Sequence, residues 1–172
     1  MHEAQTETAG DDLVIRTATT DDVDEIMVLA MAACAENGFV NPNPAKLLAE
    51  IWPALCQDHG VCFVIGKPGG KIEGLVLLRI GTLWYSDAQV VEEKAVFIYP
   101  EFRAAKGGRA RRLCEQSKRV ADALGIPLLI GVLSNSRTAG KIRMYERIFG
   151  APSGAFFLYG TRTGEWSHSA EH

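Results

Sequence analysis

The sequence predicts a mixed α/β domain whose central sheet contains one parallel β-α-β crossover. A long apolar segment at 90–99 is followed by a helical stripe that ends at Gly125, and then by a continuous apolar run at 127–133. This order is typical of a crossover, because the helix returns the chain so that the second strand lies parallel to the first. Strands joined by a short glycine-containing turn at 67–71 precede it, which indicates an antiparallel remainder of the sheet.

In the first half of the chain, caps and apolar spacing place a strand at 13–18 and two helices. Thr20 is expected to cap the first helix, whose first turn is acidic and whose apolar residues run from Val23 to Cys34 at helical spacing. Asn43, followed by proline, is expected to cap the second helix, and Pro53 should break or kink it.

In the second half, strands are expected at 60–66, 72–80 and 90–99 on either side of the turn and a loop. The glycines at 125 and 150 stop two further helices, at 108–124 and 138–149, because glycine readily adopts the left-handed C-cap conformation. Strands are also expected at 127–133 and 155–159. Helices on both faces of the sheet complete the predicted architecture.

Length and composition bound the class of protein. The 172 residues are enough for one domain, expected at 12–160, with a disordered acidic N-terminus at 1–11 and a polar tail at 161–172. No apolar run has the ~20 residues needed to span a bilayer, and the N-terminus has no leader-like pattern, so a cytoplasmic protein without membrane contact is predicted. The net charge of −3 argues against nucleic-acid binding.

Cysteines and histidines give no sign of a metal site. The four cysteines lie in apolar segments without a CxxC spacing, and the four histidines are scattered. We therefore expect buried, reduced thiols and no bound metal.

The most informative segment is 99–113, in which an apolar strand leads through a glycine-rich loop into an amphipathic helix. Five cations fall within ten residues of it: Arg103, Lys106, Arg109, Arg111 and Arg112. Backbone N–H groups, the helix dipole and these cations would meet at one place, which favours a small polyphosphate ligand. A solvated basic helix face is the alternative for the same charges. A dinucleotide or nucleoside-triphosphate loop is disfavoured, because neither G-x-G-x-x-G nor G-K-S/T is present.

Three landmarks in order give the chain a family resemblance. The phrase at 96–103, VFIYPEFR, leads into GGRA at 107–110; LVIRTA at 13–18 and YERIFG at 145–150 flank it. In these features the chain resembles the GNAT acetyltransferase superfamily over residues 13–159. It departs from the family at Ala105, where Gln or Arg is usual, and at Thr138, where Asn is usual.

The resemblance implies a GNAT-like fold and an acetyl-CoA-dependent N-acetyltransferase that moves acetyl directly to the amine of a small-molecule or peptide acceptor. It also implies a homodimer. The cofactor-binding residues carried over from the family are Val96, Phe97, Ile98, Arg103, Lys106, Gly107, Gly108, Arg109, Ala110 and Asn135. The implied catalytic residues are Tyr145, which would protonate the thiolate of coenzyme A, and Glu92, which lies six residues before Ile98 and would act as the base.

Alternatives stay open at three points. Glu92 and Glu93 should point to opposite faces of their strand, so only one of them can face the cleft. The same fold could serve as a non-catalytic coenzyme A-binding module, a sensor or an assembly component. The chain could also bind an anion or nucleotide unrelated to coenzyme A.

Overall fold

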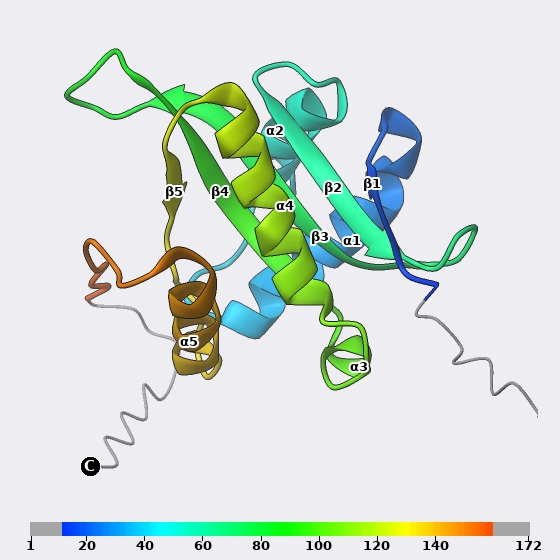
Figure 1. The fold of residues 1–172 in the computed structure, drawn as a ribbon. Coiled ribbons are helices and arrows are strands. Elements are labelled where there is room, and N and C mark those ends of the chain that lie inside the picture. The colour runs from blue at the N-terminus through cyan, green and yellow to red at the C-terminus, as the bar shows by residue number, and fades with distance from the viewer. Residues whose placement is uncertain (1–11, 160–172) are drawn as a thin grey trace, which may run out of the picture.

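The structure is a computed structural model that describes residues 12–159, and it contains one mixed sheet with helices on both faces (Figure 1). The strands are β1 (Val14–Thr17), β2 (Gly60–Gly66), β3 (Ile72–Thr82), β4 (Gln89–Ile98) and β5 (Leu128–Ile130). The helices are α1 (Val23–Asn37), α2 (Pro44–Leu55), α3 (Pro100–Arg103), α4 (Arg109–Leu124) and α5 (Thr138–Phe149), with a short 3-10 turn, η1 (Thr20–Asp22), before α1. The predicted fold class is confirmed.

The strands lie in sequence order across the sheet, from β1 at one edge to β5 at the other. Every neighbouring pair from β1 to β4 is antiparallel, and β5 joins β4 in parallel through α4. The crossover predicted from the two apolar runs is therefore present. It places the N-terminus of α4 beyond the carboxyl end of β4, where the glycine-rich loop lies.

Two apolar layers hold the helices against the sheet. On one face α1 and α2 pack against β2, β3 and β4, with Ile26, Leu29, Ile51 and Leu55 at the centre. On the other face α4 packs over β2, β3 and β4 through Leu113 and Cys114. The continuous burial of β3 follows from this arrangement, since helices cover both of its sides.

Local sequence signals explain the helix starts. The side-chain oxygen of Asn43 accepts hydrogen bonds from the backbone N–H of Ala45 and Lys46 at 3.0 and 3.2 Å, so the predicted cap of α2 is confirmed. The cap before α1 is Thr19 rather than Thr20, because η1 adds a turn in which Asp22 accepts the Thr19 N–H at 2.8 Å. Pro53 does not end α2, which continues to Leu55. The proline lies in the last turn, where its effect is the loss of one backbone N–H donor.

On the C-terminal side, one predicted strand is absent and another is shorter than predicted. The strand predicted at 155–159 is absent, and these residues are irregular, with Phe157 94% and Tyr159 101% exposed. A run of apolar residues forms a strand only when a neighbouring strand completes its hydrogen bonds, and none pairs with this segment among residues 12–159. The strand predicted at 127–133 is limited to Leu128–Ile130, because β5 leaves β4 after Ile130. The segments 1–11 and 161–172, predicted to be disordered and polar, lie outside the described residues.

The cysteines are all free thiols. Cys62 and Cys114 are buried as predicted and Cys34 is half-buried, whereas Cys56 is exposed at the end of α2. In the part of the chain that the structure describes, no helix is long and apolar enough to cross a membrane.

Candidate functional site

A cleft opens where β4 and β5 part. The two strands pair only from Val91 to Glu93 of β4, opposite Leu128 to Ile130, and β4 then continues alone to Ile98. The space between them is a pocket of about 220 Å³. Its walls come from α1, β4, the start of α4, the segment after β5, and α5; the lining residues that matter below are Glu36, Glu93, Val96, Arg103, Ala110 and Lys141.

A β-bulge in β4 decides which side chains face this cleft. Glu93 pairs with Leu78 of β3 and Ala95 pairs with Leu77, so Lys94 is an extra residue without a partner in β3. Side chains alternate between faces along a strand, and one extra residue shifts that alternation. As a result, Glu93 lies on the same face as Val96 and Ile98, toward α4.

The bulge also separates Glu92 from the segment that it was predicted to serve. In a regular strand, Glu92 and Ile98 would have their side chains on the same face, because they are six residues apart. The extra residue puts them on opposite faces. Glu92 is half-exposed and pairs with Lys94 at 2.7 Å, and it does not line the pocket. Of the two neighbouring glutamates, Glu93 therefore faces the cleft.

The free edge of β4 offers backbone groups to the cleft. Tyr99 donates its N–H to the carbonyl of Glu73 in β3 at 3.0 Å, and hydrogen-bonded positions alternate along an antiparallel pair. The backbone of Phe97 therefore points to β3, whereas that of Val96 and Ile98 points to the side where β5 is missing. Nζ of Lys141 lies 3.5 Å from the Val96 carbonyl oxygen, which is consistent with this orientation.

A buried hydrogen-bonded pair, Tyr145 and Glu93, lies next to the cleft, and of the two only Glu93 lines it. The Tyr145 hydroxyl donates to Oε1 of Glu93 at 2.5 Å, and Ser117 of α4 lies 3.5 Å from Oε2. Burial raises the pKa of Glu93, and the hydrogen bond from Tyr145 only partly opposes this rise. Burial and the adjacent Glu93 charge raise the pKa of Tyr145, so the phenol keeps its proton. Lys141 is nearby, and burial lowers its pKa.

The raised pKa of Glu93 makes a testable link between pH and stability. The folded chain holds this proton at pH values where the unfolded chain, with an ordinary pKa of about 4.3, has lost it. The stabilisation is full below that ordinary pKa and is lost as pH rises through the raised one. We expect Glu93→Gln, which cannot ionise, to gain thermal stability relative to the native protein between pH 4.5 and 8.

Thermal unfolding of both proteins across this pH range measures the difference, and Glu146→Gln, at an exposed site of α5, serves as the control. A melting-temperature gap that is constant with pH would contradict a raised pKa of Glu93.

The glycine-rich loop gives α4 an open N-terminus. Gly107 has φ 113° and Gly108 has φ 54°, a left-handed region that favours glycine. Gly108 is the N-cap, and its carbonyl accepts the first helical hydrogen bond, from Arg112, at 2.9 Å. The N–H groups of Arg109, Ala110 and Arg111 therefore have no partner within the helix, and the positive end of the dipole adds to them.

The cations of the loop have different environments. Arg109 is 7% exposed and forms an ion pair with the equally buried Glu73, and it also donates to the Lys106 carbonyl at 2.8 Å. Arg103 lines the cleft, where Nε donates to the Ile98 carbonyl at 2.8 Å and Nη2 pairs with Glu36 of α1 at 2.6 Å. Lys106 is exposed. Arg112 points away from the cleft, toward β1.

Some residues of the cleft carried no signal in the sequence, and one predicted residue lies outside it. Glu36, Arg137 and Lys141 line the pocket but belong to no landmark segment; Lys141 could have been found by its spacing of four from Tyr145 on one helix face. Asn135 is exposed in the turn before α5, where its carbonyl accepts from the N–H of Thr138 at 3.3 Å, and it does not line the pocket.

Potential metal ligands do not cluster at the cleft: within residues 12–159, no group of three or more His, Cys, Asp or Glu side chains could hold an ion.

No protein-family model matches the sequence. A search of curated proteins likewise finds no match.

Solved structures do resemble the chain. The acetyltransferase AAC(6')-Iy, in complex with a bisubstrate analogue of CoA and acetylneamine, is 19% identical with a TM-score of 0.65, over 87% of this chain and 98% of that one. A Trypanosoma brucei acetyltransferase is 19% identical, with a TM-score of 0.62 over 85% and 98%. An integron cassette protein from the mobile metagenome of a salt marsh is 23% identical, with a TM-score of 0.63 over 88% and 91%. At these identities the likeness establishes the fold, which is that of the GNAT acetyltransferases.

Proposed function

We propose that the chain is an acetyl-CoA-dependent N-acetyltransferase. The observation that carries the proposal is the cleft between β4 and β5, which has a free strand edge on one side and the glycine-capped N-terminus of α4 at one end. An extended thiol-bearing arm can pair with such an edge, while a pyrophosphate fits unsatisfied helical N–H groups. The resemblance to AAC(6')-Iy, whose structure holds a CoA-derived analogue, supports the same ligand.

The loop and the strand edge would share the binding of acetyl-CoA. In the proposal, N–H groups from Gly107, Gly108, Arg109 and Ala110 hold the pyrophosphate, and Lys106 adds a charge at the exposed rim. The outward backbone of Val96 and Ile98 holds the arm and polarises the thioester carbonyl, with Phe97 between them fixing the strand to β3. Arg103 is placed to contribute once it is released from Glu36, whereas Arg109 is better suited to fix the loop through Glu73. Asn135 stays a predicted contact of the cofactor at the rim.

The acid–base chemistry would centre on Tyr145. The amine nitrogen attacks the acetyl carbonyl carbon, the carbon–sulfur bond breaks, and the thiolate takes a proton; Tyr145 is the proton donor in this proposal. Its hydroxyl is protonated and oriented by Glu93. The proton lost by the amine needs a base. Glu92 stays the residue predicted for this role, and Glu93 is the glutamate that lines the cleft. The lining holds Glu36 and Glu93 beside Lys94, Arg103, Arg137 and Lys141, so its charge selects no particular acceptor, which is a small-molecule or peptide amine in this proposal.

One observation favours a second function, binding of coenzyme A without turnover. The Tyr145 hydroxyl is engaged by Glu93, and Arg103 is engaged by Glu36, so two side chains implied to act on the cofactor have protein partners. A sensor or assembly component would need only the loop and the strand edge. Release of free thiol from acetyl-CoA with a panel of polyamines and aminoglycosides distinguishes the two functions. Tight binding without thiol release from any panel member would favour the non-catalytic module.

Binding itself is tested at the loop. We expect Arg103→Ala/Lys106→Ala to weaken acetyl-CoA binding by about 1–3 kcal/mol, because charge-assisted hydrogen bonds to phosphate contribute on that scale. Isothermal titration calorimetry measures the change. Lys46→Ala/Lys67→Ala removes the same charge from exposed sites outside the cleft and is the control. An unchanged dissociation constant in the loop variant, or stabilisation by ATP in preference to acetyl-CoA, would overturn the proposed ligand.

A further inference from the structure

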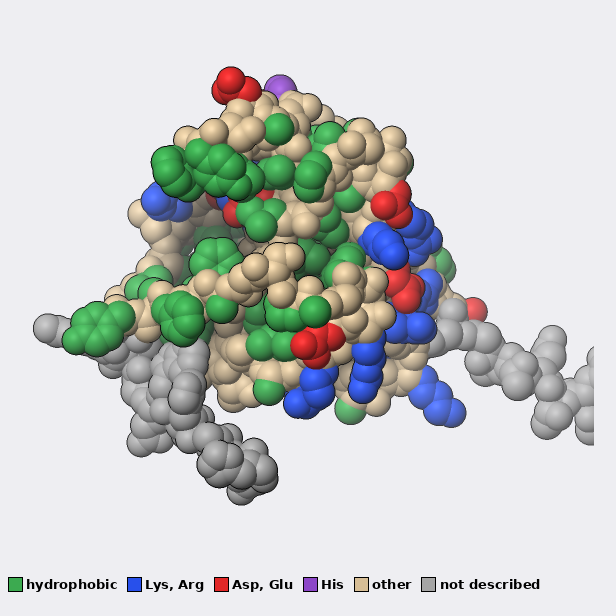
Figure 2. Space-filling model, turned by 60° about the vertical axis from the view of Figure 1, so that its left-hand side comes forward, with side chains coloured by type: hydrophobic (Ala, Val, Ile, Leu, Met, Phe, Trp, Pro, Cys, Tyr) green, Lys and Arg blue, Asp and Glu red, His purple; other side chains and the backbone are tan. Residues whose placement is uncertain are grey.

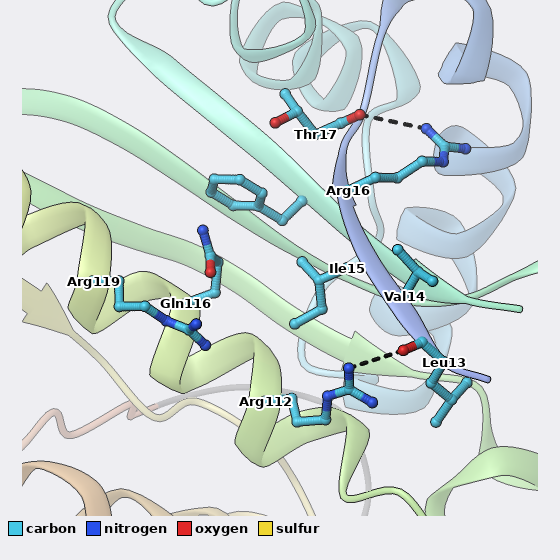
Figure 3. A pocket seen from close by; sticks show the side chains of 9 residues that line it. Leu13, Val14, Ile15, Arg16, Thr17, Arg112, Gln116 and Arg119 are labelled. Atoms are coloured by element: carbon cyan, nitrogen blue, oxygen red, sulfur yellow. Dashed lines mark hydrogen bonds between the residues drawn. The ribbon is translucent and has the colours of Figure 1, made fainter. Parts of the chain in front are cut away.

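A second concave surface lies on the other side of α4, between this helix and the edge strand β1 (Figure 3). It has a volume of about 490 Å³ and is formed by residues 13–17 and Phe63 of the sheet and by Arg112, Gln116 and Arg119 of α4. We call it the β1 groove. It shares no lining residue with the cleft between β4 and β5.

One wall of the β1 groove is cationic. Arg112, Gln116 and Arg119 occupy one face of α4 and point toward β1 in Figure 3. Of the 17 Lys and Arg residues within 12–159, seven have an Asp or Glu partner, and Arg112 and Arg119 are among the ten that do not. Within residues 12–159 neither Arg112 nor Arg119 has a carboxylate in ion-pair range; their hydrogen bonds go to the carbonyls of Leu13 and Glu115, at 2.9 and 3.4 Å. Figure 2 shows that Lys and Arg side chains gather along one flank of the molecule, although the net charge is −3.

The strand that borders the groove, β1, has an unpaired outer edge, which lies in the plane of the sheet on the side away from β2. β1 pairs only with β2, and Ala18 donates its N–H to the Cys62 carbonyl at 2.8 Å, so the even-numbered residues of β1 face β2. The backbone groups of Leu13, Ile15 and Thr17 therefore point outward. Two of their carbonyls already have side-chain donors: Arg112 donates to Leu13 at 2.9 Å, and Arg16 donates to Thr17 at 3.4 Å. An edge of this kind binds another extended chain through main-chain hydrogen bonds.

The floor between the two walls is apolar. The Ile15 side chain points into the groove in Figure 3, and Leu13 and Phe63 pack in the same layer. Arg16 points to the opposite side, where it pairs with Asp22 at 2.7 Å, and it leaves the groove to the α4 arginines.

These three features select one kind of occupant. We propose that the β1 groove binds an acidic peptide segment of a partner protein as an additional strand beside β1. Main-chain bonds to Ile15 and to the Thr17 N–H would require an extended backbone outside β1, and alternate side chains of the peptide would reach over Ile15 toward the groove. Arg112 and Arg119, seven residues or about 10 Å apart along α4, would pair with carboxylates four residues apart, about 13 Å in a strand. This inference is independent of the proposed acetyl transfer.

The test uses a nine-residue peptide of alternating Glu and Thr, capped at both ends and fluorescently labelled, with the full-length protein. We expect saturable binding by fluorescence anisotropy that weakens as NaCl is raised. Arg112→Gln/Arg119→Gln should reduce the affinity about tenfold or more, since hydrogen bonds between charged groups are lost. Arg111→Gln/Lys118→Gln removes the same charge from exposed sites of the same helix and should leave the affinity unchanged.

Two peptide controls separate strand addition from charge attraction. A peptide with Lys in place of Glu should not bind, and a Glu–Thr peptide with N-methyl groups on alternate amides should bind at least tenfold more weakly. Hydrogen exchange at the Ile15 and Thr17 amides should slow when the unmodified peptide is bound.

Equal binding of the N-methylated peptide, or an affinity that the double arginine variant keeps, would overturn the proposal. The chain's own acidic N-terminus is the competing occupant. If the peptide binds only after Glu3→Gln/Glu7→Gln, that segment fills the groove, and a partner peptide is excluded.

Discussion

Tyr145→Phe is expected to lower the turnover of acetyl-CoA about a hundredfold or more, the scale at which a positioned acid or base contributes to a proton-transfer step. Phenylalanine keeps the ring against Phe149 and Cys114 but removes the only proton that this side chain can give to the leaving thiolate. The pKa of Tyr145 is raised by burial and by Glu93, so the phenol carries its proton at neutral pH. Steady-state thiol release with an active acceptor measures the loss.

The effect should appear in kcat while the dissociation constant of acetyl-CoA stays unchanged, because Tyr145 acts on the leaving group. Tyr85→Phe, which removes an exposed hydroxyl outside the cleft, is the matched control. Full turnover by Tyr145→Phe would contradict the acid role and leave this residue as a packing group. If Glu93→Gln loses less turnover than Tyr145→Phe, Tyr145 is the proton donor and Glu93 is the residue that orients it.

Arg109→Ala is expected to destabilise the fold by about 3–5 kcal/mol, the scale for breaking a buried ion pair from one side. The substitution leaves the Glu73 carboxylate buried on β3, 5% exposed, without its guanidinium partner. It also removes the hydrogen bond to the Lys106 carbonyl, which ties the glycine-rich loop to the sheet. Chemical denaturation measures the change, and Arg111→Ala, which breaks an exposed pair with Glu115, should lose less than about 1 kcal/mol.

A double variant isolates the cause. In Glu73→Met/Arg109→Met both charges are replaced by apolar side chains, so most of the stability should return, since no unpaired charge remains buried. If Arg109→Ala were as stable as Arg111→Ala, the pair would not hold the loop. If the double variant bound acetyl-CoA as the native protein does, Arg109 would make no contact with phosphate beyond its backbone.

The sequence predicted the order of the elements from β1 to α5, apart from the short helices η1 and α3, because their signals are local. Asn43 and Pro44, the glycines at 125 and 150, and the apolar faces of α1 and α4 specify helix ends and buried sides through neighbouring residues. The short strand β5 and the missing strand at 155–159 depend instead on which segments meet across the sheet. No apolar pattern records that choice.

The candidate site divides in the same way. The glycines of the loop and Tyr145 could be recognised because a backbone conformation or a motif demands them. The ion pairs of Arg103 with Glu36 and of Arg109 with Glu73 join residues 67 and 36 positions apart, so the sequence could not show that these guanidiniums have partners. The position of Glu93 was open for another reason. It depends on the bulge at Lys94, and no residue type marks an extra residue in a strand.

The bulge at Lys94 divides β4 into two stretches with opposite rules for substitution. Before it, odd-numbered positions such as Val91 face α4, and after it even-numbered positions such as Val96 and Ile98 do so. In a scan of polar replacements, tolerance should therefore change parity once along this strand. Deletion of Lys94 would remove the bulge, and Glu93 would be followed directly by Ala95 in regular alternation, with the faces of both stretches unchanged. A mutagenesis library designed on strict alternation along β4 would therefore keep the wrong residues unchanged on one side of the bulge.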